Sequence, residues 1–376
     1  MPAAVAANRV DIEFDRRVMA AALRLGWRNA GRAHPNPAVG CVIMRGDIVV
    51  GRGWTAIGGR PHAERIALAE AGAAARGATA YVTLEPCAHN RKAGPCSVAL
   101  VDAGVARVVT ALEDPDPRTA GQGHAILAKA GIAVIEGVLV AEATRAHSGH
   151  IARVTKGRPH VTLKLAVSAD GMIGRRNGTR AMITGELASS RVQMMRTEFD
   201  VVMIGIGTAL ADDPRLTVRL PGVTGRTPAR VILDAAARLS PSARVFASIG
   251  EAPVLVFVAP DAPRERRSAL TEAGATVVET PATDGGVDLA AVLAHLAAAG
   301  YSRVLAEGGS AVAASLLAGD FADEVVLFRA PLVIGDNGIP VLVRGSLADI
   351  EAGARYRLLD VAVYGHDVMR RYGRAA

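Results

Sequence analysis

The sequence predicts an α/β protein of two domains. The chain has 376 residues, more than one typical domain holds. In both halves, short runs rich in Val, Ile and Leu alternate with helical segments, as in mainly parallel sheets covered by helices. Between the halves, a linking helix is predicted at 141–158, where Gly157 and Pro159 form a normal helix stop. We therefore expect one domain at 1–150 and another at 158–376.

Composition restricts the class of protein. Apolar residues make up 50% of the chain and the mean hydropathy is +0.26, but no run of 18 uncharged apolar residues occurs, so we expect no membrane span. The first ten residues lack the basic start and the long apolar core of a secretion signal. Three cysteines without such a signal favour a reducing, cytoplasmic setting over a disulfide framework.

The net charge of +7 indicates an anionic partner, either a phosphorylated small molecule or a nucleic acid. Aromatic residues amount to only 3% of the chain, whereas surfaces that stack single-stranded bases need them. The composition therefore favours a phosphorylated small molecule as the partner.

In the first half, the apolar spacing predicts an amphipathic helix at 14–30, followed by a loop with two prolines at 34–37. Alternating residues at 39–54 predict a β-hairpin that turns at Arg45-Gly46. Cys41 falls in its first strand, where a small buried side chain is the favoured interpretation. A further strand is expected at 80–84.

Three residues that bind Zn²⁺ well occur close together, and they are His62, Cys87 and Cys96. Three protein ligands leave the fourth tetrahedral position for water, as in catalytic zinc sites. Glu64, two residues after the histidine, can move protons to and from that water. His-x-Glu followed by Pro-Cys and a second Cys is the arrangement of zinc-dependent nucleobase deaminases.

Two other interpretations of these residues stay open. His62 could cap a helix while both cysteines are simply buried, although the ordered motif as a whole favours zinc. A closed structural zinc site would need a fourth ligand, for which His89 is the available residue. Such a site would leave Glu64 without a task.

The motifs from Asn36 to Cys96, among them N-P-A-V-G-C-V-I, P-H-A-E, Y-V-T-L-E-P-C and G-P-C, resemble the deaminase half of the bifunctional riboflavin-biosynthesis deaminase/reductase. The D-P-D-P segment at 114–117 is similar to that family's usual Asp-Pro-Asn-Pro. The resemblance implies a cytidine-deaminase-like α/β sandwich in which Asn36 contacts the substrate. Thr55 and Arg60 depart from the family, which often has a histidine and an acidic residue there.

The second half contains two further motifs after its first strand at 161–168. At 307–315, E-G-G-S-A-V-A-A-S joins a strand to a helix through two glycines, which suits a phosphate group or a plain tight turn. At 212–219, D-D-P-R-L-T-V-R gathers charged residues in an apolar region. A complete G-x-G-x-x-G after a strand is missing, so an ordinary Rossmann domain is not expected.

Together these segments resemble the reductase half of the same family, whose fold is like dihydrofolate reductase. The resemblance covers nearly the whole chain, and it implies the following roles. Residues expected to contact NADPH are Ala166, Met182, Thr208, Asp212, Gly309, Ser310, Ala311, Val312, Ala313, Ala314 and Ser315. Residues expected to bind the pyrimidine ribosyl phosphate are Lys164, Arg180, Arg196, Leu216, Arg219 and Glu307. Arg180 and Met182 stand where the family often has Ser and Trp.

The sequence thus predicts two fused catalysts. The first, with one Zn²⁺ per chain, would deaminate 2,5-diamino-6-ribosylamino-4(3H)-pyrimidinone 5′-phosphate, with Glu64 as the proton carrier. The second would use NADPH to reduce the ribosyl chain and give 5-amino-6-ribitylaminouracil 5′-phosphate. We expect a cytoplasmic homo-oligomer without a nucleic-acid or membrane partner.

Two alternatives from other classes remain. One is a nucleic-acid-acting deaminase with a C-terminal binding domain, which the positive charge favours and the scarce aromatics oppose. The other is a regulatory ligand-binding protein whose deaminase half is inactive, which the complete set of zinc-site residues opposes.

Overall fold

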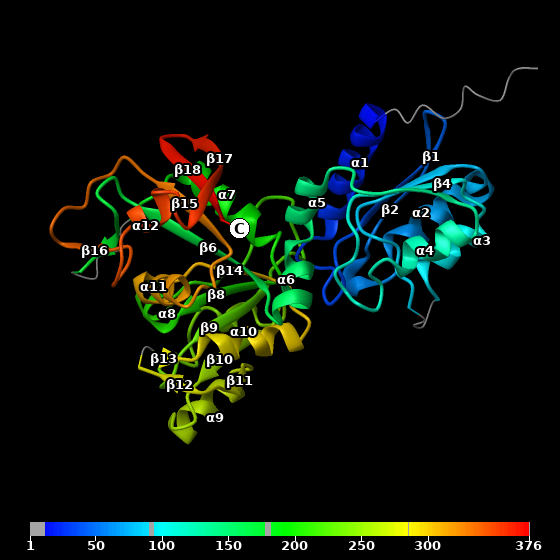
Figure 1. Ribbon diagram of the computed structural model, residues 1–376. Helices are drawn as coiled ribbons and strands as arrows, with labels where there is room; N and C mark the ends of the chain where they lie inside the picture. The colour runs from blue at the N-terminus through cyan, green and yellow to red at the C-terminus, as the bar shows by residue number, and fades with distance from the viewer. Residues whose placement is uncertain (1–11, 90–93, 177–181, 285, 376) are drawn as a thin grey trace, which may run out of the picture. The chain divides into compact units, whose positions relative to one another are not determined.

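The computed structural model describes residues 12–89, 94–176, 182–284 and 286–375 (Figure 1). The chain forms two compact units, Met1–Gly157 and Arg158–Ala376. Among the helices described, none is both long enough and apolar enough to cross a lipid bilayer.

The N-terminal unit is built on a five-stranded sheet with the strand order β2-β1-β3-β4-β5. The hairpin of β1 (Gly40–Arg45) and β2 (Ile48–Trp54) is antiparallel, and β1 also pairs antiparallel with β3 (Thr79–Val82). β4 (Arg107–Thr110) and β5 (Ala133–Ile135) continue the sheet in parallel with β3. The carboxyl ends of β3, β4 and β5 therefore meet at one edge, where ligand sites of α/β sheets lie.

Helices cover both faces of this sheet. Alternate residues of β1 point to opposite faces, with Cys41 and Ile43 on one side and Val42 and Met44 on the other. The first pair packs with α2 (Ala63–Ala71), α3 (Cys96–Asp102) and α4 (Gln122–Lys129), and the second pair packs with α1 (Ile12–Gly26) and α5 (Val140–Ala146). Cys41 is a buried core residue, in line with its favoured interpretation.

Close approach between α2 and β2 depends on glycine. A Cβ on Gly53 would lie 2.0 Å from the carbonyl oxygen of Ala63, so no other residue allows α2 to lie this close to the strand. The start of α2, which carries His62 and Glu64, is thereby fixed against the sheet.

The predicted linking helix differs in one respect from the structure. Instead of one helix at 141–158 there are two, α5 and α6 (Ser148–Lys156), because the backbone at His147 leaves helical geometry. The buried His147 ring places Nε2 3.0 Å from Thr83 Oγ1, a tertiary contact that the helical pattern alone does not reveal.

The C-terminal unit is built on a nine-stranded sheet with the order β11-β10-β9-β8-β14-β6-β15-β18-β17. Pairing is parallel from β11 to β15, and the last two strands are antiparallel. The strands are β6 (His160–Val167), β8 (Val201–Gly205), β9 (Ala229–Leu233), β10 (Val254–Val258), β11 (Thr276–Glu279), β14 (Arg303–Ala306), β15 (Glu324–Arg329), β17 (Tyr356–Tyr364) and β18 (Asp367–Arg374). Two short ribbons pair β7 (Met172–Arg175) with β16 (Gly338–Pro340) and β12 (Ala282–Thr283) with β13 (Gly286–Val287).

Each face of this larger sheet also has its own core. One face packs with α10 (Leu289–Ala298), α11 (Ser310–Ala318) and α12 (Ala348–Glu351), and the other with α7 (Glu186–Arg196), α8 (Ile206–Asp212) and α9 (Arg264–Glu272). α8 follows β8 directly and α11 follows β14 after a three-residue turn, and these two strands are neighbours. Both helices therefore begin at the same edge of the sheet.

Candidate active sites

The three predicted zinc ligands come from three different elements of the N-terminal unit. His62 immediately precedes α2, and Cys96 is the first residue of α3. Cys87 lies in the segment that follows β3, at the carboxyl edge of the parallel strands. The structure brings all three together, with one potential ligand atom from each residue within 4.8 Å of the others.

The distances show which atoms face each other. Nδ1 of His62 lies 3.6 Å from Cys87 Sγ and 3.4 Å from Cys96 Sγ, and the Cys96 backbone N–H donates to Cys87 Sγ at 3.3 Å. One nitrogen and two sulfurs therefore converge on a common point. This donor set fits Zn²⁺, and three ligands leave one position for water, as catalytic sites require.

A hydrogen bond between the two thiols shifts their pKa values in opposite directions. The Cys96 thiol donates to the Cys87 sulfur, and this hydrogen bond lowers the pKa of Cys87 to about 4. The same bond and burial together raise the pKa of Cys96. Because cysteine binds metal as the thiolate, a divalent cation bound here would displace the thiol protons.

Glu64 lies in the first turn of α2 and is only 3% exposed. Burial raises the pKa of its carboxyl group, although the nearby His62 opposes the shift. A buried carboxyl group with a raised pKa takes and returns protons near neutral pH more readily than an exposed one.

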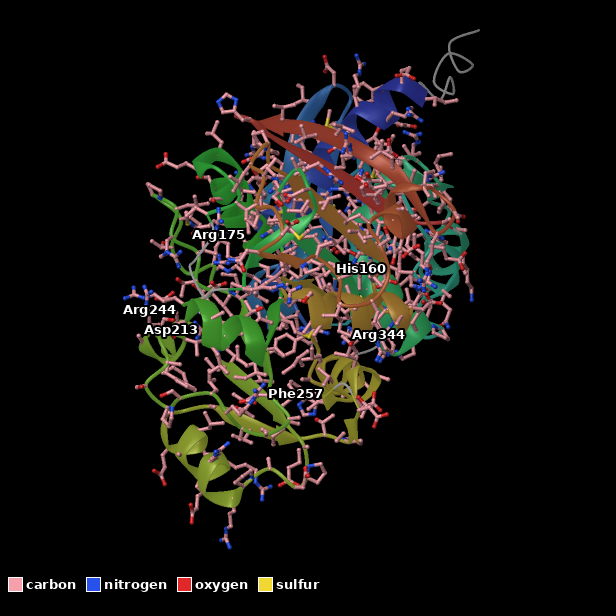
Figure 2. All side chains as sticks on the ribbon, turned by 90° about the vertical axis from the view of Figure 1, so that its left-hand side faces the viewer. His160, Arg175, Asp213, Arg244, Phe257 and Arg344 are labelled. Atoms are coloured by element: carbon pink, nitrogen blue, oxygen red, sulfur yellow. The ribbon has the colours of Figure 1, made fainter. Side chains whose placement is uncertain are left out.

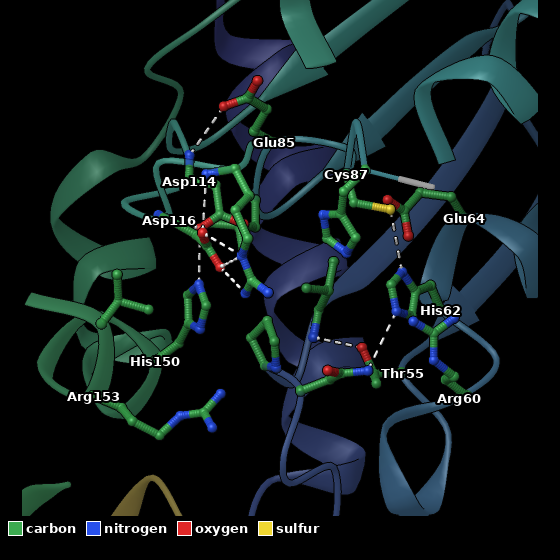
Figure 3. Close-up of a pocket in the computed structure, with 17 residues that line it drawn as sticks. Thr55, Arg60, His62, Glu64, Glu85, Cys87, Asp114, Asp116, His150 and Arg153 are labelled. Atoms are coloured by element: carbon green, nitrogen blue, oxygen red, sulfur yellow. Dashed lines mark hydrogen bonds and ion pairs between the residues drawn. The ribbon is translucent and has the colours of Figure 1, made fainter. Parts of the chain in front are cut away.

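A cavity of about 290 Å³ opens at this cluster (Figure 3). Asn36 lies on its wall and points its amide nitrogen at Gly59 O, 2.8 Å away, and at His62 Nε2, 3.4 Å away. Its other polar lining residues include Thr55, Arg60, Asp114, Asp116, Arg118, His150 and Arg153. The positive side chains fit a substrate that carries a phosphate group.

Glu85, two residues before Cys87, holds the segment that forms one wall of the cavity. Its carboxylate accepts hydrogen bonds from the backbone N–H groups of Asp114, Gly121, Gly123 and His124, at 2.8 to 3.2 Å. Both ends of the loop between β4 and α4 are therefore attached to the segment that carries the predicted zinc ligand Cys87.

Two side-chain contacts complete that wall. His150 of α6 places Nε2 2.8 Å from Asp114 Oδ1, and Arg118 forms a bidentate pair with Asp116. The Arg118 guanidinium lowers the pKa of Asp116 to about 2. At neutral pH the Asp116 side chain is therefore an acceptor only.

In the C-terminal unit, a buried ion pair joins α7 to the end of β14. Arg196 donates from Nε and an NH₂ group to both oxygens of Glu307, at 2.7 and 2.9 Å, and also to Thr217 O. Burial alone would raise the pKa of Glu307, but Arg196 and Lys164 together hold it below its usual range. Burial also lowers the pKa of Lys164, against the opposing charge of Glu307.

A cavity of about 170 Å³ adjoins this pair, and it gathers Arg196, Asp212, Leu216 and Arg219. These are four of the residues that the sequence assigned to substrate or NADPH. The structure adds residues that the sequence analysis did not single out as site residues, Asp213, Pro214, Arg215 and Arg244. Figure 2 shows Asp213 beside Arg244, whose backbone N–H donates to Asp213 Oδ1 at 2.8 Å.

The glycine turn at 307–310 leads from β14 into α11. A Cβ on Gly308 would lie 2.6 Å from the Cβ of Val312, and one on Gly309 would lie 3.1 Å from Thr208 Oγ1. Without side chains on Gly308 and Gly309, the backbone at the start of the nine-residue helix α11 lies close to Thr208 on α8. Backbone N–H groups at a helix start and a nearby hydroxyl group are suited to bind a phosphate group. This arrangement fits the phosphates of a nicotinamide dinucleotide.

The other predicted cofactor contacts vary in accessibility. Ala166 is partly buried on β6, and Met182 is 71% exposed. Ser310, Ala311, Val312, Ala314 and Ser315 lie on α11 with at least part of each residue accessible, whereas Ala313 is fully buried in the core. Arg180 lies outside the described residues.

Comparison with known proteins assigns both units. Residues 12–112 match the family model for the cytidine and deoxycytidylate deaminase zinc-binding region, and residues 159–369 match the model for the RibD C-terminal domain. The riboflavin biosynthesis protein RibD of Escherichia coli K12 is 34% identical over 94% of this chain and 98% of its own. The chain belongs to the RibD family.

Other members of the RibD family agree with this assignment. The RibD protein of Aquifex aeolicus is 35% identical over 95% of this chain and 98% of its own. A structure of Acinetobacter baumannii RibD superposes with a TM-score of 0.86, at 34% identity and covering 97% of this chain and all of that one. The deaminase/reductase of Thermotoga maritima superposes with a TM-score of 0.83, at 34% identity, covering 97% of this chain and 99% of its own.

The family predicted from the motifs is thus confirmed, together with the two-unit α/β fold class. The chain is a bifunctional RibD deaminase/reductase of riboflavin biosynthesis that uses zinc and NADPH. The sequence analysis missed the hydrogen-bonding role of Glu85 and the contributions of His150 and Arg153. Only the D-P-D-P resemblance pointed to that side of the cavity.

Proposed function

We propose that the N-terminal unit deaminates 2,5-diamino-6-ribosylamino-4(3H)-pyrimidinone 5′-phosphate, with His62, Cys87 and Cys96 as the zinc ligands. The convergence of one imidazole nitrogen and two sulfurs beside a buried carboxyl group supports this proposal most directly. When bound, zinc supplies a Lewis acid that lowers the pKa of water towards neutrality.

Glu64 moves the protons in this reaction. Its carboxylate takes a proton from the attacking water and passes it to the amino group that leaves. Asn36 orients the pyrimidine, supported by the position of its amide group beside His62 on the cavity wall.

The C-terminal unit would then open the ribosyl chain of the aminouracil product by reduction at C1′. NADPH, when bound, supplies the hydride. Arg196, Leu216, Arg219 and Glu307 bind the pyrimidine ribosyl phosphate, and Lys164 donates the proton that opening of the sugar ring requires. An ammonium group with a lowered pKa suits proton donation near neutral pH.

Cofactor contacts in this unit come from two helix starts and the adjoining strand. Thr208 and Asp212 on α8 and the segment Gly309–Ser315 hold the dinucleotide, together with Ala166 and Met182. This assignment is supported by the close approach of the Thr208 hydroxyl to the backbone of Gly309. We further propose domain limits of 1–150 and 158–376, and a homo-oligomer located in the cytoplasm. The three free thiols in the described residues favour the cytoplasmic location.

The test is mass analysis of the diaminopyrimidinone ribosyl phosphate after incubation with the zinc-loaded protein. Without NADPH we expect the deaminated product alone, and with NADPH the deaminated and reduced product. Loss of deamination in Glu64→Gln with retained zinc, and unchanged reduction of added aminouracil substrate, would assign the first step. If neither product forms from this substrate, the proposed substrate is wrong.

A further inference from the structure

A second group of metal-binding side chains lies in the N-terminal unit. Glu113, His124 and Glu136 each place one potential ligand atom within 4.8 Å of the others. Glu113 follows β4, Glu136 follows β5, and His124 lies in the first turn of α4. Because β4 and β5 are parallel neighbours, their carboxyl ends bring the two carboxylates together beside the helix.

His124 is only 6% exposed and is held from one side. Its Nε2 lies 3.0 Å from Thr110 Oγ1. Its Nδ1 is buried without a hydrogen bond, although Glu136 Oε2 lies 3.2 Å away. When Nε2 carries the proton and donates it to Thr110, Nδ1 directs a lone pair at the two carboxylates. Metal-binding histidines usually have this kind of support on the second ring nitrogen.

The two glutamates are exposed and carry like charges, so their proximity costs free energy unless a cation lies between them. One imidazole nitrogen and two carboxylate oxygens are a donor set for Zn²⁺ and similar first-row divalent ions. A positive charge on His124 would explain why Glu136 lies close to it, but it would not explain why Glu113 lies there as well. We propose that Glu113, His124 and Glu136 form a second divalent-cation site, distinct from the cysteine-containing one.

The position of this site gives it a role in the deaminase cavity. Glu113 directly precedes Asp114, which lines the cavity and pairs with His150. The backbone N–H of His124 donates to Glu85, two residues before the zinc ligand Cys87. A cation bound to Glu113 and His124 therefore joins the two ends of the loop 114–123. It would hold Asp116 and Arg118, which also line the cavity, in one position relative to the zinc ligands.

The direct test is titration of the full-length, zinc-loaded protein with Co²⁺, followed by absorption spectroscopy and metal analysis. We expect one further equivalent to bind, with d–d absorption but without the charge-transfer band that cobalt–thiolate bonds produce. The double variant Glu113→Gln/Glu136→Gln should lose this equivalent and keep its zinc. The control is the double variant Glu142→Gln/Glu272→Gln, which removes the same two negative charges at other exposed positions. This control should bind cobalt like the unchanged protein.

A second readout separates a site with a role in the cavity from a bare surface site. In the Glu113→Gln/Glu136→Gln variant we expect the KM of deamination to rise several-fold with kcat nearly unchanged, because no cation then connects the two ends of the loop 114–123 that lines the cavity. Reduction should be unaffected. The proposal is overturned if the unchanged protein binds no further cobalt, if the double variant binds it equally well, or if bound cobalt shows the thiolate band.

Discussion

The two reaction centres differ in how the chain assembles them. The candidate deaminase centre takes its three predicted zinc ligands and Glu64 from positions 62 to 96, on two helix starts and in the segment after one strand. The proposed reductase centre brings together Lys164, Arg196 and Glu307, and the last two are separated by 111 residues. The first centre brings together sulfur and imidazole side chains, whereas the second brings together buried side chains of opposite charge.

This difference has a consequence for robustness. A metal site is held by its ligands and by the cation, so loss of the proton carrier should change rate without changing the fold. A buried ion pair depends on both partners, because either charge alone remains desolvated. Substitution of the proton carrier in the first centre should therefore lower activity more than stability, whereas substitution of one charged partner in the second should lower both.

The largest expected effect is on the deamination rate. Glu64→Gln should lower it by about 10²- to 10⁴-fold, because the carboxylate that carries protons is replaced by an amide of the same size. Zinc content and reduction of the aminouracil substrate should stay unchanged, as measured by metal analysis and NADPH oxidation. A variant that deaminates at the ordinary rate would exclude Glu64 as the proton carrier.

In the reductase centre, Glu307→Gln should reduce both activity and stability. The Arg196 and Glu307 side chains are 11% and 9% exposed, and removing one partner of such a pair costs about 3–5 kcal/mol. Chemical unfolding of the C-terminal unit would measure the loss. The double variant Arg196→Met/Glu307→Leu should regain stability but not reduction, and recovery of reduction would argue against a substrate-binding role for the pair.

A smaller, pH-dependent effect is expected at Lys164. The ammonium form is present below the pKa in the folded protein, and it is lost as the pH rises through that value. Since burial lowers this pKa, the rate of reduction should fall at a pH below the ordinary lysine value of about 10.4. Lys164→Arg should lower the rate at every pH and remove this decline, because the guanidinium stays charged and does not give up a proton. Identical profiles of kcat/KM against pH would exclude proton donation by Lys164.

The smallest effect is expected at the partly exposed pair of Asp116 and Arg118. A lowered pKa in the folded state stabilises the protein above the unfolded value of about 3.9, and this contribution is lost as the pH falls towards 2. With the Arg118 side chain 58% exposed, the contribution should stay below about 1 kcal/mol. Asp116→Asn should therefore unfold at nearly the same denaturant concentration at pH 7 and differ less from the parent at pH 3.

Particular residues show why the sequence predicted one centre better than the other. His62, Cys87 and Cys96 lie in short motifs whose residue types already imply a metal, and the structure brings them together, with Glu64 beside Cys96. The four hydrogen bonds to Glu85 come from residues 29 to 39 positions later, and local pattern does not encode such contacts.

In the second unit, the family resemblance singled out Arg196 and Glu307 separately as substrate contacts. Their pairing depends on which strands become neighbours in the sheet, and the sequence alone does not fix that order. Arg244 lines the same cavity from a segment without a recognisable motif, so no local signal could have identified it. The break between α5 and α6 at His147 could not be predicted for the same reason, since the contact of His147 with Thr83 joins residues that are far apart in the sequence.

The central claim is that one chain carries two separable catalysts, of which only the first needs zinc. The most direct measurement follows both reactions in one preparation as zinc is removed by a chelator and then restored, with the aminouracil substrate supplied for reduction. Deamination should fall and recover in proportion to zinc, and Cys96→Ser should not recover, while reduction stays constant. Reduction that falls together with zinc, or deamination that persists without it, would contradict the account.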